Sequence, residues 1–216
     1  MTLIKDTLKQ NKRLYRISKI IRDLSEEMQV PAFLVGGCVR DLLLEPETHS
    51  VDIDIMVEGD GIKFANQLGK KLKVSTVVPF PKFATARIPY NECEIEVASA
   101  RLESYDPKSR NPKDIVMTDI NEDLQRRDFT VNAMAISLQK DNMGMLIDPF
   151  DGLKDLSAKI LRTPMSDSDV TFADDPLRMM RAAYFSAKLE MEIDEKSLQS
   201  IKNNAERISI VSQERV

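Results

Sequence analysis

The stretches FLVGGCVRD (residues 33–41) and VDIDIMV (residues 51–57) decide the fold. The first predicts an apolar strand over 32–35 that ends at Gly36-Gly37, followed by a short helix over 39–44. The second alternates strictly, and alternate side chains of a strand point to opposite faces of its sheet. Its apolar members are therefore expected to enter the core, while Asp52 and Asp54 project together from the other face.

Short strand and helix patterns surround this centre from residue 32 to about residue 138. Crossovers this short, with hairpins among them, favour a mixed, partly antiparallel sheet over a doubly wound parallel one. Residues 103–118 hold few large apolar groups and several Ser, Asp, Asn and Pro, which predicts a mobile loop. The other elements predicted around the centre are helices at 3–28 and 61–72, strands at 74–78, 83–88 and 92–98, and closing strands at 134–138 and 145–147.

Beyond the segment DPFDG (residues 148–152) the apolar pattern is helical to the end. We therefore predict a boundary near residue 150, with an α/β head over 1–150 and a helical segment over 151–216. The expected fold class is α+β.

Composition excludes several classes of protein. Lysine and arginine number 31 and aspartate and glutamate 35, so a strongly basic, unselective nucleic-acid binder is not expected. Two cysteines without a CxxC spacing exclude a disulfide framework and a cysteine-based zinc module. The apolar runs fall short of the roughly 20 residues that a membrane span needs. We expect a reduced, cytoplasmic protein that makes no membrane contact.

The alternating strand carries the first sign of chemistry. At a rise of about 3.3 Å per residue, Asp52 and Asp54 start roughly 6.6 Å apart, so that their oxygens can close on one cation. Oxygen ligands without His or Cys favour Mg²⁺ over zinc. Taken alone, the Asp-x-Asp pattern is a weak signal that favours a solvated pair at a sheet edge over a metal site.

The glycine pair strengthens the first interpretation. Glycines allow backbone N–H groups to approach a phosphate, and the helix that begins there directs its positive end toward it. Arg40, one turn into that helix, could clamp a phosphate oxygen. An ordinary tight turn is the alternative. Together the two stretches describe a nucleoside triphosphate held against a metal ion.

Several motifs in the order of this chain resemble those of the class II tRNA nucleotidyltransferase and bacterial poly(A) polymerase superfamily, and the resemblance covers about residues 30–216. The matching segments are GGCVRD with the later DID (36–41 and 52–54), EV with Arg101 (96–97), RRDFTVNA (126–133), DPFDG (148–152) and DDPLRMMR (174–181). The resemblance implies a polymerase-β-type nucleotidyltransferase head with a short mixed sheet, followed by an all-helical neck.

The resemblance also implies a role for particular residues. Periodicity alone does not choose between Glu94 and Glu96, and the family pattern selects Glu96 as the third acid. A helix end held by ion pairs around Arg126 and Arg127 remains the plain alternative to a phosphate contact. The implied catalytic and metal-binding residues are Asp52, Asp54 and Glu96, with two Mg²⁺ ions, and the implied nucleotide-binding residues are Gly36, Gly37, Arg40, Arg127, Asp128, Asn132, Asp175, Arg178 and Arg181.

Within this pattern, Arg127 is expected on phosphate, Asp128 on a ribose hydroxyl with Asn132 in support, and Asp175 with Arg178 on the edge of the base. Arg181 is expected on phosphate. The last three would share one face of a helix, where an ion pair would look the same. The chain departs from the family at Asp174, where Glu is frequent, and at Tyr184, where a further Arg is frequent.

The implied reaction transfers CMP or AMP from CTP or ATP to the 3′ end of tRNA. An A-adding enzyme, a poly(A) polymerase, or a non-catalytic nucleotide- or RNA-binding module are the alternatives. Relatives continue into a body and a tail that grip tRNA, so the chain is expected to be a fragment or to rely on another subunit.

Overall fold

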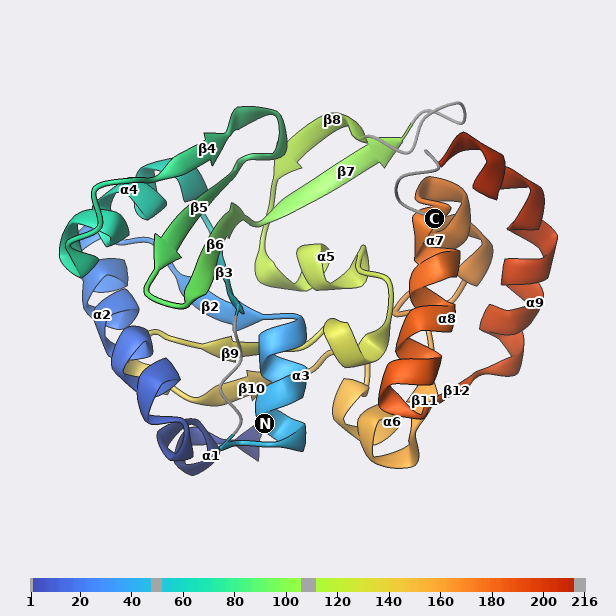
Figure 1. Cartoon of the computed structure of the whole chain (residues 1–216), viewed down its shortest axis with the longest axis horizontal. Coiled ribbons are helices and arrows are strands. Elements are labelled where there is room, and N and C mark those ends of the chain that lie inside the picture. Colours follow the sequence, from blue (N-terminus) through green and yellow to red (C-terminus); the bar gives the residue numbers. More distant parts are fainter. Residues whose placement is uncertain (1, 48–51, 106–111, 212–216) are drawn as a thin grey trace.

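The computed structural model describes residues 2–47, 52–105 and 112–211. Within these residues the centre is an eight-stranded sheet of order β1-β10-β9-β2-β3-β6-β5-β4 (Figure 1). β3 and β6 are parallel neighbours, and the other pairs are antiparallel, so the predicted mixed sheet is confirmed. The strands are β1 (Thr2–Leu3), β2 (Ala32–Val35), β3 (Asp52–Val57), β4 (Val78–Phe80), β5 (Thr85–Tyr90), β6 (Cys93–Ser99), β9 (Ala135–Ser137) and β10 (Met145–Ile147).

Helices cover the sheet and form the C-terminal part. Among the described residues, no helix has both the length and the apolar character needed to cross a membrane. The α-helices are α1 (Lys5–Gln10), α2 (Lys12–Met28), α3 (Gly37–Leu44), α4 (Gly61–Leu72), α5 (Ile120–Gln125), α6 (Gly152–Ala158), α7 (Ser168–Asp174), α8 (Leu177–Leu189) and α9 (Glu195–Asn204). Short 3₁₀ turns are η1 (Pro81–Phe83), η2 (Thr130–Asn132), η3 (Lys140–Asn142) and η4 (Ala205–Ile210).

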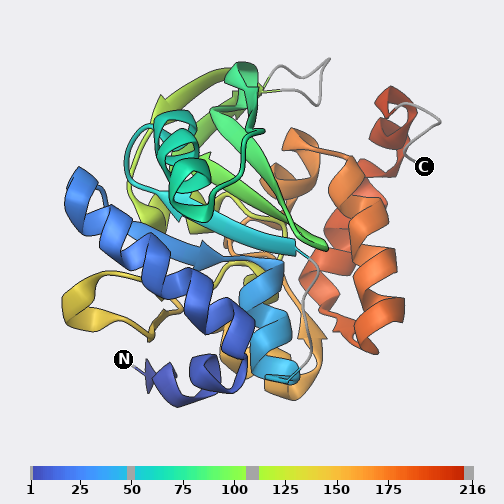
Figure 2. The same ribbon diagram turned by 60° about the vertical axis from the view of Figure 1, so that its left-hand side comes forward.

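The two faces of the sheet carry different side chains. Ile53, Ile55 and Val57 are buried in the main core, on the face that α2 and α4 cover (Figure 2). Met56 on the opposite face belongs to a smaller cluster with residues of α5. Asp52 and Asp54 share that second face, as the alternation predicts. Val51, the first member of the predicted strand, lies outside the described residues.

Three predicted boundaries in the first half of the chain were wrong. The helix expected over 3–28 is two helices, because the side chain of Asn11 accepts a hydrogen bond from the Leu14 amide and begins α2 there. The strand expected over 74–78 is absent. Lys73 adopts the left-handed conformation at the end of α4, the Val74 amide donates to the Gly69 carbonyl, and β4 begins only at Val78. Phe83 belongs to η1 rather than to the following strand.

The predicted loop at 103–118 was also wrong where it is described. β7 (Arg101–Tyr105) and β8 (Pro112–Met117) form an antiparallel hairpin beside the main sheet, and residues 106–111 lie outside the described part. The polar composition led to the wrong prediction because the Glu103 side chain is buried in the hairpin. Its charge is balanced there by ion pairs with Arg101 at 2.7 Å and Arg126 at 3.1 Å. A paired charge can occupy a strand position that composition assigns to solvent.

The chain after residue 150 packs directly on the head. Between residues 151 and 211, the only strands are one parallel pair, β11 (Ile160–Leu161) and β12 (Glu192–Ile193), and the regular elements are otherwise helical. Phe129 of the head meets Phe185 of α8 edge to face at 6.1 Å, and the main hydrophobic core includes both. Because this core continues across residue 150, the division into a head and a separate neck remains a prediction.

Gly152, at the first turn of α6, provides a test of this packing. A Cβ there would meet the Thr130 carbonyl oxygen and lie 2.9 Å from Cγ of Met134. We predict that Gly152→Ala lowers the free energy of unfolding by about 1–3 kcal/mol, because backbone must move to admit the methyl group. Urea unfolding measures this. Ser157→Ala on the exposed side of the same helix should change the free energy of unfolding by less than about 0.5 kcal/mol. Equal changes in the two variants would contradict the close packing of Gly152 against Thr130 and Met134.

Candidate functional site

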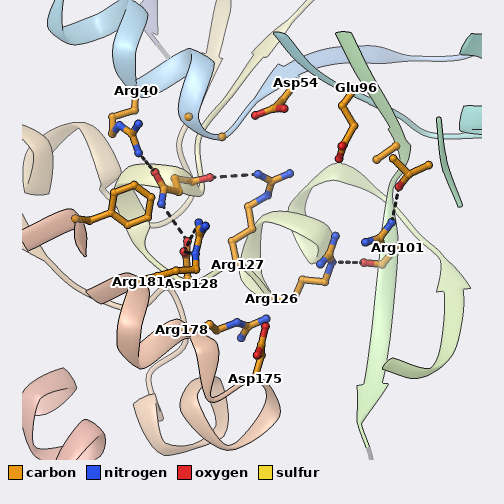
Figure 3. A pocket seen from close by; sticks show the side chains of 16 residues that line it. Arg40, Asp54, Glu96, Arg101, Arg126, Arg127, Asp128, Asp175, Arg178 and Arg181 are labelled. Carbon is orange, nitrogen blue, oxygen red and sulfur yellow. Dashed lines mark hydrogen bonds and ion pairs between the residues drawn. The ribbon is translucent and has the colours of Figure 1, made fainter. Parts of the chain in front are cut away.

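A cavity of about 380 Å³ opens between the second face of the sheet and α8 (Figure 3). Its lining includes six arginines against four carboxylates, a local basic site in a chain of net charge −4. The lining residues are Gly36, Gly37, Arg40, Asp54, Thr85, Glu96, Ala98, Arg101, Arg126, Arg127, Asp128, Asn132, Asp175, Arg178, Arg181 and Phe185. All of the residues expected at a nucleotide site thus line one cavity, with the exception of Asp52 among the acids.

The parallel pairing of β3 with β6 brings the acids together. Asp54 stands directly across from Glu96, and Asp52 stands across from Glu94. Paired residues of neighbouring strands point to the same face, and so do residues two apart on one strand, so all four carboxylates project from the same face of the sheet. Glu96 lines the cavity and Glu94 does not; strand periodicity left the two equivalent, and Glu96 is the acid that the family pattern selects. Asp52 is exposed on that face, outside the cavity lining.

Asp54 lies in an environment that disfavours a bare negative charge. Burial raises its pKa to about 6, with further contributions from the carboxylates of Glu96 and Asp52. Arg127 and Arg40 act in the opposite direction. A half-buried carboxylate that feels the negative charge of two other acids is stabilised by a bound cation, which lowers both the desolvation cost and the repulsion.

Glu96 has a protein partner in this structure. Its carboxylate accepts from Nε of Arg87 at 2.9 Å, and Arg87 also pairs with Glu94 at 3.3 Å. Within the described ranges, no three His, Cys, Asp or Glu side chains stand close enough together to form a ready-made metal centre. The ion-pair alternative for Glu96 is therefore observed, on a side chain that also faces the cavity.

The glycine turn packs closely against the acids and an arginine. Gly36 has a φ of 69°, in the left-handed region, and caps α3. A Cβ on Gly36 would lie 2.7 Å from Nη1 of Arg127 and 3.7 Å from a carboxylate oxygen of Asp54. Glycine at this position therefore satisfies both the backbone conformation and the close approach of charged groups.

Arg127 is held from behind by Asp123, a fully buried carboxylate of α5 that sequence reasoning missed. Nε and Nη2 of Arg127 lie 3.3 Å from Asp123, which also accepts from Arg126 at 2.6 Å and from the Arg101 amide at 3.2 Å. The ion-paired helix end that the sequence left as an alternative is thus present. It orients Arg127 toward Gly36 rather than removing it from the cavity.

Asp128 joins the head to α8. It accepts from Asn132 at 3.1 Å and from Nε of Arg181 at 2.6 Å (Figure 3). Arg40 in turn donates to Asn132 at 2.5 Å and is itself buried. Phe185, another residue that the sequence did not single out, lies between the guanidinium groups of Arg40 at 5.0 Å and Arg181 at 4.9 Å. Its position four residues after Arg181 on one helix was the available signal.

Asp175 and Arg178 both reach the cavity, but not from one helix face as predicted. Asp175 lies between α7 and α8, where Pro176 interrupts the helix, and its side chain accepts from the Leu177 amide at 3.1 Å. Arg178 is buried on α8 and donates to the Thr171 carbonyl at 3.2 Å. Burial raises the pKa of the neighbouring Asp174, while Arg178 opposes this shift.

The strand order, with paired carboxylates on parallel neighbours, places this head in the polymerase-β-type nucleotidyltransferase class. The chain belongs to the poly A polymerase head domain family, which matches residues 32–162.

Relatives agree with this assignment. The chain is 42% identical over 162 residues to an A-adding tRNA nucleotidyltransferase of Aquifex aeolicus, covering 75% of this chain and 19% of that protein. It is 38% identical over 194 residues to a CCA-adding enzyme of Lactobacillus delbrueckii subsp. bulgaricus, covering 88% and 46%. The Thermotoga maritima CCA-adding enzyme complexed with tRNA-CCA superimposes with a TM-score of 0.81 at 31% identity, covering 100% and 49%. The chain spans about half or less of each relative's length.

The pKa of Asp54 predicts a pH-dependent stability in metal-free buffer. Because the folded state binds this proton more tightly than the unfolded chain, the associated stability is full below about pH 3.8 and is lost as pH rises through about 6. The asparagine in Asp54→Asn does not titrate, so between pH 4 and pH 7.5 the free energy of unfolding of this variant should rise by about 2 kcal/mol relative to that of the wild type.

Denaturant unfolding across this range, with EDTA present, measures the difference between the two proteins. Ile53→Val on the same strand introduces no titrating group and should cost about 1 kcal/mol at every pH. A constant difference between Asp54→Asn and wild type would contradict the assigned environment of Asp54.

Proposed function

We propose that this chain is the nucleotide-adding head and neck of an enzyme that transfers CMP and AMP from CTP and ATP to the 3′ end of tRNA. The observation that carries the proposal is the cavity in which Asp54 and Glu96 stand side by side, with the Gly36 turn close to both Asp54 and Arg127. Relatives named for A addition and CCA addition support the choice of substrate.

The triphosphate would lie against the glycine turn. Gly37 begins α3, so the helix directs its positive end at an anion there, whereas the Gly36 amide already donates to the Met134 carbonyl at 3.1 Å. Arg127, already oriented by Asp123, supplies charge-assisted donors at the same point. Arg40 is bonded to Asn132 and stacked on Phe185, so we assign it to supporting the turn in addition to the phosphate role that the family pattern implies.

Asp52, Asp54 and Glu96 would hold the divalent ions, which we take to be two Mg²⁺. The residues fit such ions, because they offer only carboxylate oxygens and because burial beside like charges leaves Asp54 with a raised pKa. When bound, the ions would neutralise the triphosphate and lower the pKa of the attacking hydroxyl. Glu96 would exchange its ion pair with Arg87 for this role.

The sugar and the base would face α8. Asp128 is positioned to accept from a ribose hydroxyl, and Asn132 and Arg181 hold its carboxylate in place. Asp175 and Arg178 would pair with the edge of C or A and thereby act as a protein template. In the reaction, the RNA 3′ oxygen bonds to the α-phosphorus in line, the bond to the bridging oxygen breaks, and pyrophosphate leaves.

Addition of A alone is the second candidate, since the relative with 42% identity is an A-adding enzyme. A non-catalytic module would bind nucleotide without turnover. We further propose that grip on the tRNA body requires additional domains or a partner subunit, because the chain spans about half or less of the relatives described.

The acids provide the direct test of this activity. In an enzyme that contains this chain, Asp52→Asn and Asp54→Asn should each lower nucleotide addition by roughly 10³-fold or more, because charge neutralisation at the reacting phosphate is lost. The measurement is extension of labelled tRNA that lacks its CCA end, with sequencing of the products made from CTP and ATP.

Products that end in CCA support the CCA assignment, and A added only to tRNA ending in CC supports the second candidate. Binding of CTP without extension by the wild type would favour the module. Extension by both variants at wild-type rates would refute the catalytic assignment of the acids.

Arg178 tests the template. Arg178→Lys keeps the charge and removes the planar pair of donors, so the ratio of kcat/KM for CTP to that for ATP should change by about 10-fold or more. Single-nucleotide incorporation with each triphosphate measures the ratio. Lys188→Ala, at the end of the same helix, should keep the ratio of kcat/KM for CTP to that for ATP within about 2-fold of the wild-type ratio. An unchanged ratio in Arg178→Lys would remove this residue from base selection.

A further inference from the structure

A second cavity of about 310 Å³ adjoins the first on the side away from α8. The two share Thr85, Glu96 and Arg101, so that Glu96 faces both. Where the first cavity has glycines, the second has two aromatic rings, Phe80 and Phe83. Neither ring lines the first cavity.

The rings are exposed on a firmly held backbone. Phe80 is 36% exposed and Phe83 is 41% exposed, although phenylalanine is among the residues most often buried. Pro81 begins η1 between them, and the Phe83 carbonyl accepts from Thr85 at 2.9 Å and also from Nη1 of Arg101. Exposed apolar residues are common on protein surfaces, so the rings gain significance only from their place in a cavity that borders the carboxylates.

A cation accompanies the rings. The guanidinium of Arg87 lies 5.3 Å from the centre of the Phe80 ring, and its protein partners are Glu96 and Glu94. If Glu96 turns to a divalent ion, as the proposed function requires, Arg87 loses its 2.9 Å partner and can pair with a phosphate. Proteins that bind single-stranded nucleic acid combine aromatic side chains, which stack on the bases, with cationic side chains, which pair with the phosphates.

We propose that this second cavity receives the last nucleotides of the acceptor RNA, with bases stacked on Phe80 and Phe83 and a backbone phosphate on Arg87. The inference rests on the proposed function. The incoming nucleotide would occupy the glycine and α8 side of the carboxylates, so the attacking hydroxyl has to approach from another side. The second cavity meets that requirement, because it opens on Glu96 and carries charge complementary to RNA.

The test is photo-crosslinking of this chain to a 12-nucleotide RNA that ends in 5-iodouridine, with adducts mapped by mass spectrometry and affinity measured by fluorescence anisotropy. Ca²⁺ replaces Mg²⁺ to prevent turnover. We expect adducts on Phe80 or Phe83, and an affinity about 10-fold weaker in each of Phe80→Leu and Phe83→Leu. Phe83→Tyr, which keeps the aromatic face, should bind within 2-fold of wild type, as should Leu198→Ala on the exposed side of α9.

Calorimetric titration with CTP separates failure of this inference from failure of the proposed function. The four variants should bind CTP within 2-fold of wild type, since none of them contributes to the nucleotide side. Absence of CTP binding in the wild type would overturn the proposed function.

Three outcomes would overturn the proposed RNA site while leaving the proposed function intact, provided that CTP binds normally. They are adducts at other residues, absence of adducts, and unchanged RNA affinity in the Leu variants. Self-association of the wild type that Phe83→Leu abolishes, without adducts at these rings, would assign the surface to a second copy and also overturn it.

Discussion

The parallel pairing of β3 with β6 is the constraint on which the rest of the site depends. Its register sets Asp54 opposite Glu96 and fixes both on the face away from α2 and α4. A shift of one residue would turn Ile53 and Ile55 toward the cavity and bury the acids in the main core, at a large cost in free energy. The hydrophobic effect on one face therefore enforces the electrostatic arrangement on the other.

Charge on that second face is balanced by arginines that the fold holds from behind. Asp123 is fully buried under Arg126 and Arg127, and Asp128 holds Arg181 at 2.6 Å. Because each arginine has several donors, a pair with one carboxylate orients the guanidinium and leaves other donors toward the cavity. The fold thus holds these charged groups in place by itself, and in the function we propose this reduces the ordering cost of nucleotide binding.

The helical part completes the cavity instead of standing apart from it. α8 contributes Arg178, Arg181 and Phe185, and the last of these packs on Phe129 of the head. A movement of α8 relative to the sheet would alter the partner of Asp128 and the wall that faces the base. Recognition of ribose and base, in the function we propose, is therefore linked to the packing between the two parts of the chain.

Local pattern was sufficient to predict the mixed sheet, the helix at 61–72, the glycine turn and the common face of Asp52 and Asp54, because period-2 alternation and glycine punctuation are written in neighbouring residues. It failed at residues 103–105 and 112–117, where polar residues interrupt the strands and Glu103 is held by ion pairs with Arg101 and Arg126. It failed at Asn11 as well, where one side chain capping a helix divides a continuous apolar stripe. In both cases the deciding interaction is a specific polar bond, which composition and periodicity do not register.

The sequence by itself determined which residue types are present and which of them share a strand face. Only the tertiary structure decided that Glu96, which strand periodicity did not separate from Glu94, lines the cavity, and that Asp123 stands behind two arginines. It also decided that Asp175 lies in the break between two helices, whereas Arg178 lies on α8. The physical reason is that strand pairing, helix docking and buried ion pairs join residues that lie far apart along the chain. The free energy of each such contact depends on both partners, so neither partner's local pattern contains it.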